Sequence, residues 1–303
     1  MQENFKSGFV CMLGRPNVGK SSILNYLVGN KISIVSAIPQ TTRYQIKGIL
    51  NLNGAQIVFV DTPGIHSFKD DLARHLNTIA KKSIEGCDLL IYVVDVSRKI
   101  GKEEGKAMDL LASQRIKIIM ALNKIDLGAP YINDYINHWS NIIKNRNIKD
   151  TLVYYFPISA KTGQNMGSLQ NAIVDNLPNQ HPFYDKETLT DFPLKFRAAE
   201  IIREKLFLKL KKEVPHSLAV EIENIEDKDK VTVVEAVIYV NRVSQKKIVI
   251  GEKGNFIKQV GIESRKEIET IVNKKVYIDI RVKVLSDWQK SPRVLKELGY
   301  WWA

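Results

Sequence analysis

Two different patterns of apolar and polar residues divide the chain. Through about residue 180, longer segments of helical spacing alternate with short, dense apolar runs, which span residues 8–14, 56–62, 88–96, 116–124 and 153–159. Runs of this length and density are typical of strands buried on both faces of a parallel sheet. Strands that alternate with helices predict a doubly wound α/β domain with a mostly parallel sheet over residues 1–178.

The second half of the chain changes pattern after a proline-bearing stretch, residues 179–193, which we interpret as a linker because Pro182 and Pro193 disfavour regular structure. The segments that follow predict helix, strand, strand, helix, helix and strand, at residues 194–212, 218–226, 231–240, about 245–250, 255–273 and 276–285. This order predicts a smaller α+β domain over residues 194–285, followed by a tail over residues 286–303.

Composition and charge limit the class of protein. The 303 residues leave room for about two domains, and the content of 44% apolar and 26% charged residues is that of an ordinary soluble protein. We expect no leader peptide and no membrane span, and we expect Cys11 and Cys87, both in apolar runs, to be buried reduced thiols. The net charge of +12 predicts an anionic partner such as RNA, DNA or a membrane surface.

The segment Gly14–Ser22, GRPNVGKSS, matches the phosphate-binding pattern G-x-x-x-x-G-K-[ST] between a predicted strand and a predicted helix. Its glycines allow backbone N–H groups and the helix N-terminus to face phosphates. Lys20 would reach the β- and γ-phosphates, and the Ser21 hydroxyl would ligate Mg²⁺. An ordinary strand–loop–helix turn is the alternative, but it has no need of this pattern. Further nucleotide contacts are expected from Gly14, Asn17, Val18, Gly19 and Ser22.

Two short motifs at later strand ends predict which base is bound. In NKID, residues 123–126, the Asp126 carboxylate can accept two hydrogen bonds from guanine N1 and N2, which adenine cannot offer. In SAK, residues 159–161, the Ala160 N–H could meet guanine O6. Either motif alone fits a plain strand-end turn, but their order and their positions favour a guanine site. This site includes Asn123, Lys124, Ser159 and Lys161.

With these motifs in order, the first half of the chain resembles the translation-factor class of P-loop GTPases. Its signatures read GRPNVGKS, QTTR, DTPG, NKID and SAK. The resemblance implies that Thr41 or Thr42 closes on Mg²⁺ and the γ-phosphate, and we favour Thr42 over Thr41. It also implies that Asp61 holds the metal through water and that the Gly64 N–H bonds the γ-phosphate. A plain polar loop is the alternative for either threonine.

One group expected at a hydrolytic site is missing. Ile65 lies where many GTPases carry a Gln that orients the attacking water. An apolar side chain cannot hydrogen-bond water, so charge stabilisation must come from elsewhere. We expect Asn17 to help hold K⁺ against the phosphates, in place of an arginine finger. A general base at His66 is the alternative, although a histidine in a loop is more often a surface residue.

The second domain carries the turn Gly251–Gly254, GEKG, between two predicted helices. This is the arrangement by which a type II KH domain clamps about four nucleotides of single-stranded RNA. Residues 242–275 hold nine basic residues against four acidic ones, which agrees with an RNA surface. A simple helix–helix turn is the alternative, and a carboxylate beside phosphate is unfavourable at Glu252. The expected RNA contacts are Gly251, Glu252, Lys253, Gly254 and Lys258.

A GTPase domain followed by one KH domain is similar to the bacterial Era GTPase family over essentially the whole chain. The resemblance implies a GTP/GDP switch with slow hydrolysis that binds single-stranded RNA near the 3′ end of 16S rRNA and assists assembly of the 30S ribosomal subunit. It also implies a cytoplasmic location with weaker, peripheral association to the anionic inner face of the cell membrane; DNA is not an expected partner. A constitutive RNA-binding chaperone and a membrane-surface GTPase are the alternatives.

Overall fold

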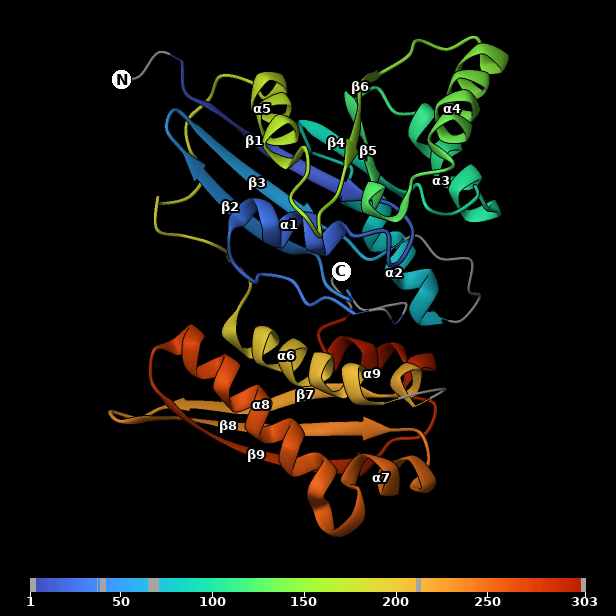
Figure 1. Ribbon diagram of the computed structural model, residues 1–303. Helices are drawn as coiled ribbons and strands as arrows, with labels where there is room; N and C mark the ends of the chain where they lie inside the picture. The colour runs from blue at the N-terminus through green and yellow to red at the C-terminus, as the bar shows by residue number, and fades with distance from the viewer. Residues whose placement is uncertain (1–3, 37, 39–41, 65–70, 211–213, 301–303) are drawn as a thin grey trace. The chain divides into compact units, whose positions relative to one another are not determined.

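The computed structural model describes residues 4–36, 38, 42–64, 71–210 and 214–300 (Figure 1). The chain divides into two compact units: the first holds most of the residues up to Asp191, and the second holds the residues from Phe192 onward together with two short segments from earlier in the chain. Each unit has its own hydrophobic core. Within the described residues, no helix has both the length and the apolar character required to cross a bilayer.

The first unit contains a six-stranded sheet whose neighbouring strands are parallel, except that the edge strand β2 runs antiparallel to β3. Every residue of β3, β4 and β5 is buried, as expected for strands covered on both faces. In spatial order the strands are β2 (Ile46–Leu52), β3 (Ala55–Asp61), β1 (Lys6–Leu13), β4 (Leu89–Asp95), β5 (Ile118–Asn123) and β6 (Leu152–Ile158).

Helices cover both faces of this sheet (Figure 1). Residues of α2, α3 and α4 form one core cluster with β1, β4 and β5, and this cluster includes the fully buried Trp139. The helices α1 and α5 lie on the opposite face. This confirms the predicted doubly wound α/β class. The helices are α1 (Lys20–Val28), α2 (Asp71–Lys82), α3 (Lys102–Ala112), α4 (Ile132–Arg146) and α5 (Met166–Asn176).

The segment after α5 is hydrogen-bonded to the β2–β3 edge of the sheet. The Gln56 side chain accepts hydrogen bonds from the backbone N–H groups of Phe183 (2.7 Å) and Tyr184 (3.0 Å), and it donates to the Tyr184 carbonyl (2.7 Å). The Ile49 N–H donates to the Leu189 carbonyl at 2.9 Å. Although no helix or strand forms here, many of these residues have fixed backbone partners in the first unit.

The second unit has the predicted order of helix, strand, strand, helix, helix and strand. Its three-stranded sheet pairs β7 with β8 antiparallel and β8 with β9 parallel, and the two helices between β8 and β9 supply the crossover that a parallel pair requires. The smaller α+β domain is thereby confirmed. Its elements are α6 (Leu194–Lys209), β7 (Ala219–Asp227), β8 (Val231–Val240), α7 (Val243–Ile250), α8 (Asn255–Val272) and β9 (Lys275–Val284).

The residues after β9 pack into the second unit. Trp288 is fully buried, and its indole N–H donates to the Ser217 carbonyl at 2.9 Å. A short helix, α9 (Pro292–Glu297), follows, and Leu295 and Tyr300 are also buried. Trp288, Leu295 and Tyr300, in the described part of the tail at residues 286–300, are therefore core residues.

The two cysteines differ in their burial. Cys11 is fully buried in β1, as predicted, whereas Cys87 is only partly buried because it lies in the turn before β4. Both are free thiols. The prediction of a buried thiol is wrong for Cys87.

Candidate functional site

The loop between β1 and α1 has a backbone shape that depends on glycine. Gly14 and Gly19 have φ values of 153° and 103°. A Cβ atom at Gly14 would lie 2.3 Å from the Val93 carbonyl oxygen, and one at Gly19 would lie 2.2 Å from the Asn123 amide nitrogen. Asn17 also has a positive φ of 63°, which asparagine tolerates. The loop therefore turns tightly and delivers the chain into α1 at Lys20.

The Lys20 ammonium is held inside this loop. Its side chain is buried, with 6% of the residue exposed, and Nζ donates to the carbonyls of Gly14 (3.2 Å) and Arg15 (3.0 Å). Burial lowers the pKa of Lys20 to about 8, although the nearby Asp61 carboxylate opposes the shift. A buried ammonium of this kind favours an anionic ligand.

A cluster of oxygen atoms lies beside Lys20. The Ser21 hydroxyl donates to Asp61 Oδ2 at 2.7 Å and lies 3.2 Å from the Thr42 hydroxyl. Asp61 is fully buried, and its Oδ1 accepts no hydrogen bond from the described residues. Burial raises the pKa of Asp61, while Lys20 and the hydroxyls of Ser21 and Ser33 oppose this shift. Hydroxyl and carboxylate oxygens, one of them buried without a donor, fit a hard cation such as Mg²⁺.

The oxygen cluster is not a metal site made of side chains alone. In the part of the chain that the structure describes, no group of three or more His, Cys, Asp or Glu side chains could hold a metal. A cation at Ser21, Thr42 and Asp61 would need further oxygen ligands from a bound phosphate or from water. Thr41, the alternative to Thr42, lies outside the described residues.

The DTPG motif lies against the phosphate loop. The Thr62 hydroxyl donates to the Met12 carbonyl at 2.7 Å, which fixes the start of the motif to β1. A Cβ atom at Gly64 would lie 2.6 Å from the Pro16 nitrogen, so the backbone at Gly64 approaches the loop closely. Ile65 and His66, which bear on the missing water-orienting group, lie outside the described residues.

Asn123 joins the two motifs predicted to recognise the base. Its side-chain amide donates to the Val18 carbonyl at 2.8 Å and accepts from the Ala160 N–H at 3.0 Å. The Ser159 hydroxyl donates to Asp126 Oδ1 at 2.6 Å, which orients that carboxylate. NKID and SAK, which are 33 positions or more apart in sequence, therefore form one site next to the phosphate loop.

Lys124, in the NKID motif, is hydrogen-bonded both to the phosphate loop and to the end of β4. Its Nζ donates to the Asn17 carbonyl at 2.8 Å and to Asp95 Oδ2 at 2.7 Å. Burial alone would raise the pKa of Asp95, but hydrogen bonds from Lys124 and Ser97 bring it below its usual range. Of the other predicted residues, Ser22 lies in the first turn of α1 and Lys161 is exposed after β6.

Arg15 makes a connection that the sequence did not reveal. Its guanidinium donates to the Glu103 carboxylate at 2.7 Å and to Glu104 Oε1 at 2.6 Å. The other oxygen of Glu104 accepts from the Gly101 N–H at the start of α3. These two acidic residues are 88 and 89 positions away in sequence, so no local pattern could indicate the contact.

In the second unit, the predicted GEKG turn connects α7 to α8. Gly251 and Gly254 have φ values of 76° and 78°, and Lys253 has a φ of 49°. A Cβ atom at Gly251 would lie 2.5 Å from the Cβ of Phe256, whereas one at Gly254 would meet nothing within 4 Å. Glu252 and Lys253 are exposed at the tip.

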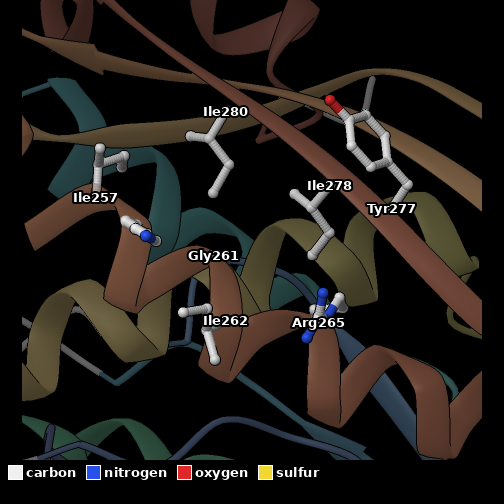
Figure 2. A pocket seen from close by; sticks show the side chains of 8 residues that line it. Ile257, Gly261, Ile262, Arg265, Tyr277, Ile278 and Ile280 are labelled. Carbon is white, nitrogen blue, oxygen red and sulfur yellow. The ribbon is translucent and has the colours of Figure 1, made fainter. Parts of the chain in front are cut away.

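A groove lies between α8 and β9, next to this turn (Figure 2). Ile278 and Ile280 from β9 and Ile257 from α8 line it, together with Gly261, where an added Cβ atom would lie 3.6 Å from Ile280 Cδ1, an ordinary contact distance. Tyr277 at the rim is 59% exposed. The remaining lining residues are Lys258, Ile262 and Arg265.

The sequence predicted only Lys258 among these groove residues. Apolar side chains, an exposed aromatic ring and two cations together suit stacked bases and a phosphate backbone. The alternation of apolar and polar residues over 276–285 already placed Ile278 and Ile280 on one face of a strand. Nothing in that pattern indicated that a groove would lie between this face and α8.

The fold and these two sites define a P-loop GTPase joined to a KH domain. Family models agree: residues 9–124 match a 50S ribosome-binding GTPase and residues 213–289 match a KH domain. The chain is 40% identical to GTPase Era of Geotalea daltonii over 99% of both chains, and 41% identical to that of Geobacter metallireducens over 99% of this chain and 100% of the relative. The chain belongs to the GTPase Era family, and it is a GTPase.

Two solved structures resemble the whole chain. One is Era in complex with MgGDPNP and nucleotides 1506–1542 of 16S ribosomal RNA, with a TM-score of 0.90 and 36% identity. The other is a variant of Aquifex aeolicus Era bound to GDP·AlF4⁻, with a TM-score of 0.89 and 36% identity. Both comparisons cover 98% of this chain and 99% of the other.

Proposed function

We propose that this GTPase is a slow GTP/GDP switch that binds single-stranded RNA near the 3′ end of 16S rRNA and assists assembly of the 30S subunit. The observation that carries the proposal is the full-length similarity to Era solved with MgGDPNP and that RNA segment. The geometry of both sites supports it, because each offers the chemistry that its ligand requires.

At the nucleotide site, the phosphates lie on the loop of Gly14, Asn17, Val18 and Gly19 and at the N-terminus of α1, near Ser22. Lys20 binds the β- and γ-phosphates. Asp126 accepts hydrogen bonds from guanine, and the Ala160 N–H meets its O6, with Lys124 and Lys161 beside the base. Ser159 holds Asp126 by one oxygen, at 2.6 Å, and each carboxylate oxygen can accept a further bond.

Ser21, Thr42 and Asp61 would hold Mg²⁺, which when bound neutralises charge on the phosphates. The Gly64 N–H bonds the γ-phosphate and so distinguishes GTP from GDP. Asn17 contributes to a K⁺ site that supplies the charge stabilisation which an apolar residue at position 65 cannot give. Equal turnover in KCl and NaCl, unchanged by Asn17→Ala, would remove the K⁺ part of the proposal.

At the KH unit, the GEKG turn approaches the RNA backbone and the groove accepts bases. Lys253 and Lys258 neutralise phosphates, and Tyr277 offers a ring on which a base can stack. The net charge of +12 also supports weaker, peripheral association with an anionic membrane surface.

The test is binding of a labelled RNA carrying the 3′ end of 16S rRNA, with a GTP analogue, with GDP and without nucleotide. We expect at least about tenfold preference over a scrambled RNA and over DNA of the same sequence, and an affinity that depends on the nucleotide. Indifference to RNA sequence would contradict the rRNA assignment, and identical affinity in all three states would favour a constitutive RNA chaperone.

Hydrolysis is the second measurement. Unaided GTPases of this kind turn over at roughly 10⁻⁴ to 10⁻² per second, and we expect this chain to fall in that range until RNA or a ribosomal particle accelerates it. Cleavage at tens per second by the purified protein alone would contradict a timing role.

A further inference from the structure

The Asp61 carboxylate has a second support outside the nucleotide-binding motifs. Ser33, which follows α1, is fully buried, and its hydroxyl donates to Asp61 Oδ2 at 2.8 Å. The same oxygen accepts the Ser21 hydroxyl at 2.7 Å, while Oδ1 accepts nothing from the described residues. The two oxygens of one carboxylate are thus in unequal surroundings.

Ser33 is itself held by a side chain of α1. The Asn25 amide oxygen accepts the N–H groups of Ile32 and Ser33, each at 2.9 Å, and the Asn25 amide nitrogen donates to the Ser33 carbonyl at 2.7 Å. The neighbouring Ile32 and Ile34 are buried. Three hydrogen bonds and two apolar anchors therefore fix the backbone from which the Ser33 hydroxyl extends.

We propose that Ser33 is a positioning residue for the Mg²⁺ site: its hydroxyl, fixed by Asn25, engages Asp61 Oδ2 and so directs Oδ1 toward the metal and its water. The terminal torsion of an aspartate is broad and nearly two-fold, so a carboxylate with fewer donors can exchange its oxygens. Groups outside the ligand shell that orient ligands in this way commonly change metal affinity 10- to 100-fold.

The inference rests on the proposed Mg²⁺–nucleotide site and adds a residue to it. Ser21 has two roles there, because its oxygen can ligate the cation while its proton still goes to Asp61. Ser33 has only the second role. Its removal should therefore weaken metal binding and leave the contacts to the phosphates and to guanine in place.

Four substitutions separate this role from a general loss of packing. Ser33→Ala removes the hydroxyl, Ser33→Cys fills the same space with a weak donor, and Ser33→Thr retains the hydroxyl. The matched control is Ser7→Ala, because Ser7 is also fully buried in the first unit, and its hydroxyl donates to the backbone carbonyls of Gln180 (3.1 Å) and His181 (2.6 Å).

The measurement is Mn²⁺ binding to the GDP complex of the full chain by electron paramagnetic resonance, with melting temperatures to verify folding. Ser33→Ala and Ser33→Cys should each raise the Mn²⁺ dissociation constant about tenfold. Ser33→Thr should stay within about threefold of wild type and Ser7→Ala within about twofold. Steady-state kinetics should show the same shift in the Mg²⁺ requirement, with the KM for GTP at saturating Mg²⁺ little changed.

Two results would overturn the inference alone. In the first, the wild-type GDP complex binds Mn²⁺ and both Ser33→Ala and Ser33→Cys match it within about twofold. In the second, Ser7→Ala loses as much affinity as Ser33→Ala, which would assign the effect to folding. A wild-type GDP complex that binds no Mn²⁺ would instead contradict the proposed metal site itself.

Discussion

The nucleotide site and the groove between α8 and β9, which we propose as the RNA site, differ in how their side chains are held. Lys20, Asp61 and Asn123 are buried and joined to other parts of their site by hydrogen bonds. In the KH unit, Lys253 and Lys258 are exposed, and Tyr277 is 59% exposed. A small ligand of fixed shape favours preorganised polar groups, whereas a flexible polymer is bound by an open surface of stacking and charge. Single substitutions should accordingly have large effects at the first site and graded effects at the second.

The largest effect is expected for Asp126→Asn. The substitution removes the acceptor for guanine N1 and N2, so GTP affinity should fall by about a thousandfold or more. The affinity for xanthosine triphosphate should rise, because its C2 carbonyl can accept a hydrogen bond from the new amide. Competition against a fluorescent GDP measures both. The control is Asp134→Asn on α4, which is exposed and lies outside the site. Unchanged selectivity between the two nucleotides would contradict the role of Asp126.

Tyr277→Ala should have the next largest effect. Loss of a stacking ring costs about 1 to 3 kcal/mol per base, so RNA affinity should fall about 5- to 150-fold, as measured by fluorescence anisotropy. Tyr277→Phe keeps the ring and should bind nearly as wild type does. An equal loss in the Phe variant would mean that the hydroxyl, and not stacking, matters.

A smaller effect on RNA affinity is expected when a negative charge is placed in the GEKG turn. Gly254 has a left-handed backbone with open space around it, and both Asn and Asp tolerate that conformation. Gly254→Asp should bind RNA about fivefold more weakly than Gly254→Asn, because its carboxylate repels the phosphate backbone, and the gap should narrow as salt rises. A gap that does not respond to salt would exclude an electrostatic cause.

The smallest effect concerns stability at the nucleotide site. The folded pKa of Asp95 lies below its ordinary value of 3.8, so the folded state binds fewer protons and gains stability from the ionised form above that pH. Asp95→Asn should lower the free energy of unfolding by about 1 kcal/mol at pH 7. Urea unfolding should show this difference shrinking as the pH falls below about 4. A difference that persists at pH 3 would point to packing.

The sequence was most informative where structure and chemistry are local. Dense apolar runs predicted five of the six strands of the first sheet, and the glycine patterns predicted the phosphate-binding loop and the GEKG turn, whose glycines have positive φ values. The strand β2 was not predicted, because Ile46–Leu52 mixes apolar residues with Gly48, Lys47 and Asn51 and is not a dense apolar run. It is an edge strand, so only part of it is buried.

The functional contacts that the sequence did not predict join residues that lie far apart in the chain. Ser33 meets Asp61 28 positions away, and Arg15 meets Glu104 89 positions away, without any repeated spacing. The groove likewise depends on how α8 packs along β9, which brings Arg265 of α8 and Tyr277 of β9 to the same groove. Trp288, in the segment predicted to be a tail, is fully buried, and its indole N–H donates to the backbone carbonyl of Ser217, 71 positions away.

The environment of Lys20 also links ligand binding to folding. Burial disfavours the charged ammonium enough to lower its pKa to about 8, so the domain carries a cost at neutral pH that an anionic ligand can offset. A ligand that binds only the folded state stabilises it by about 2.7 kcal/mol at a hundred times its dissociation constant. In the proposed nucleotide site, where this ammonium binds the β- and γ-phosphates, bound guanine nucleotide should therefore raise the resistance of the domain to unfolding and proteolysis.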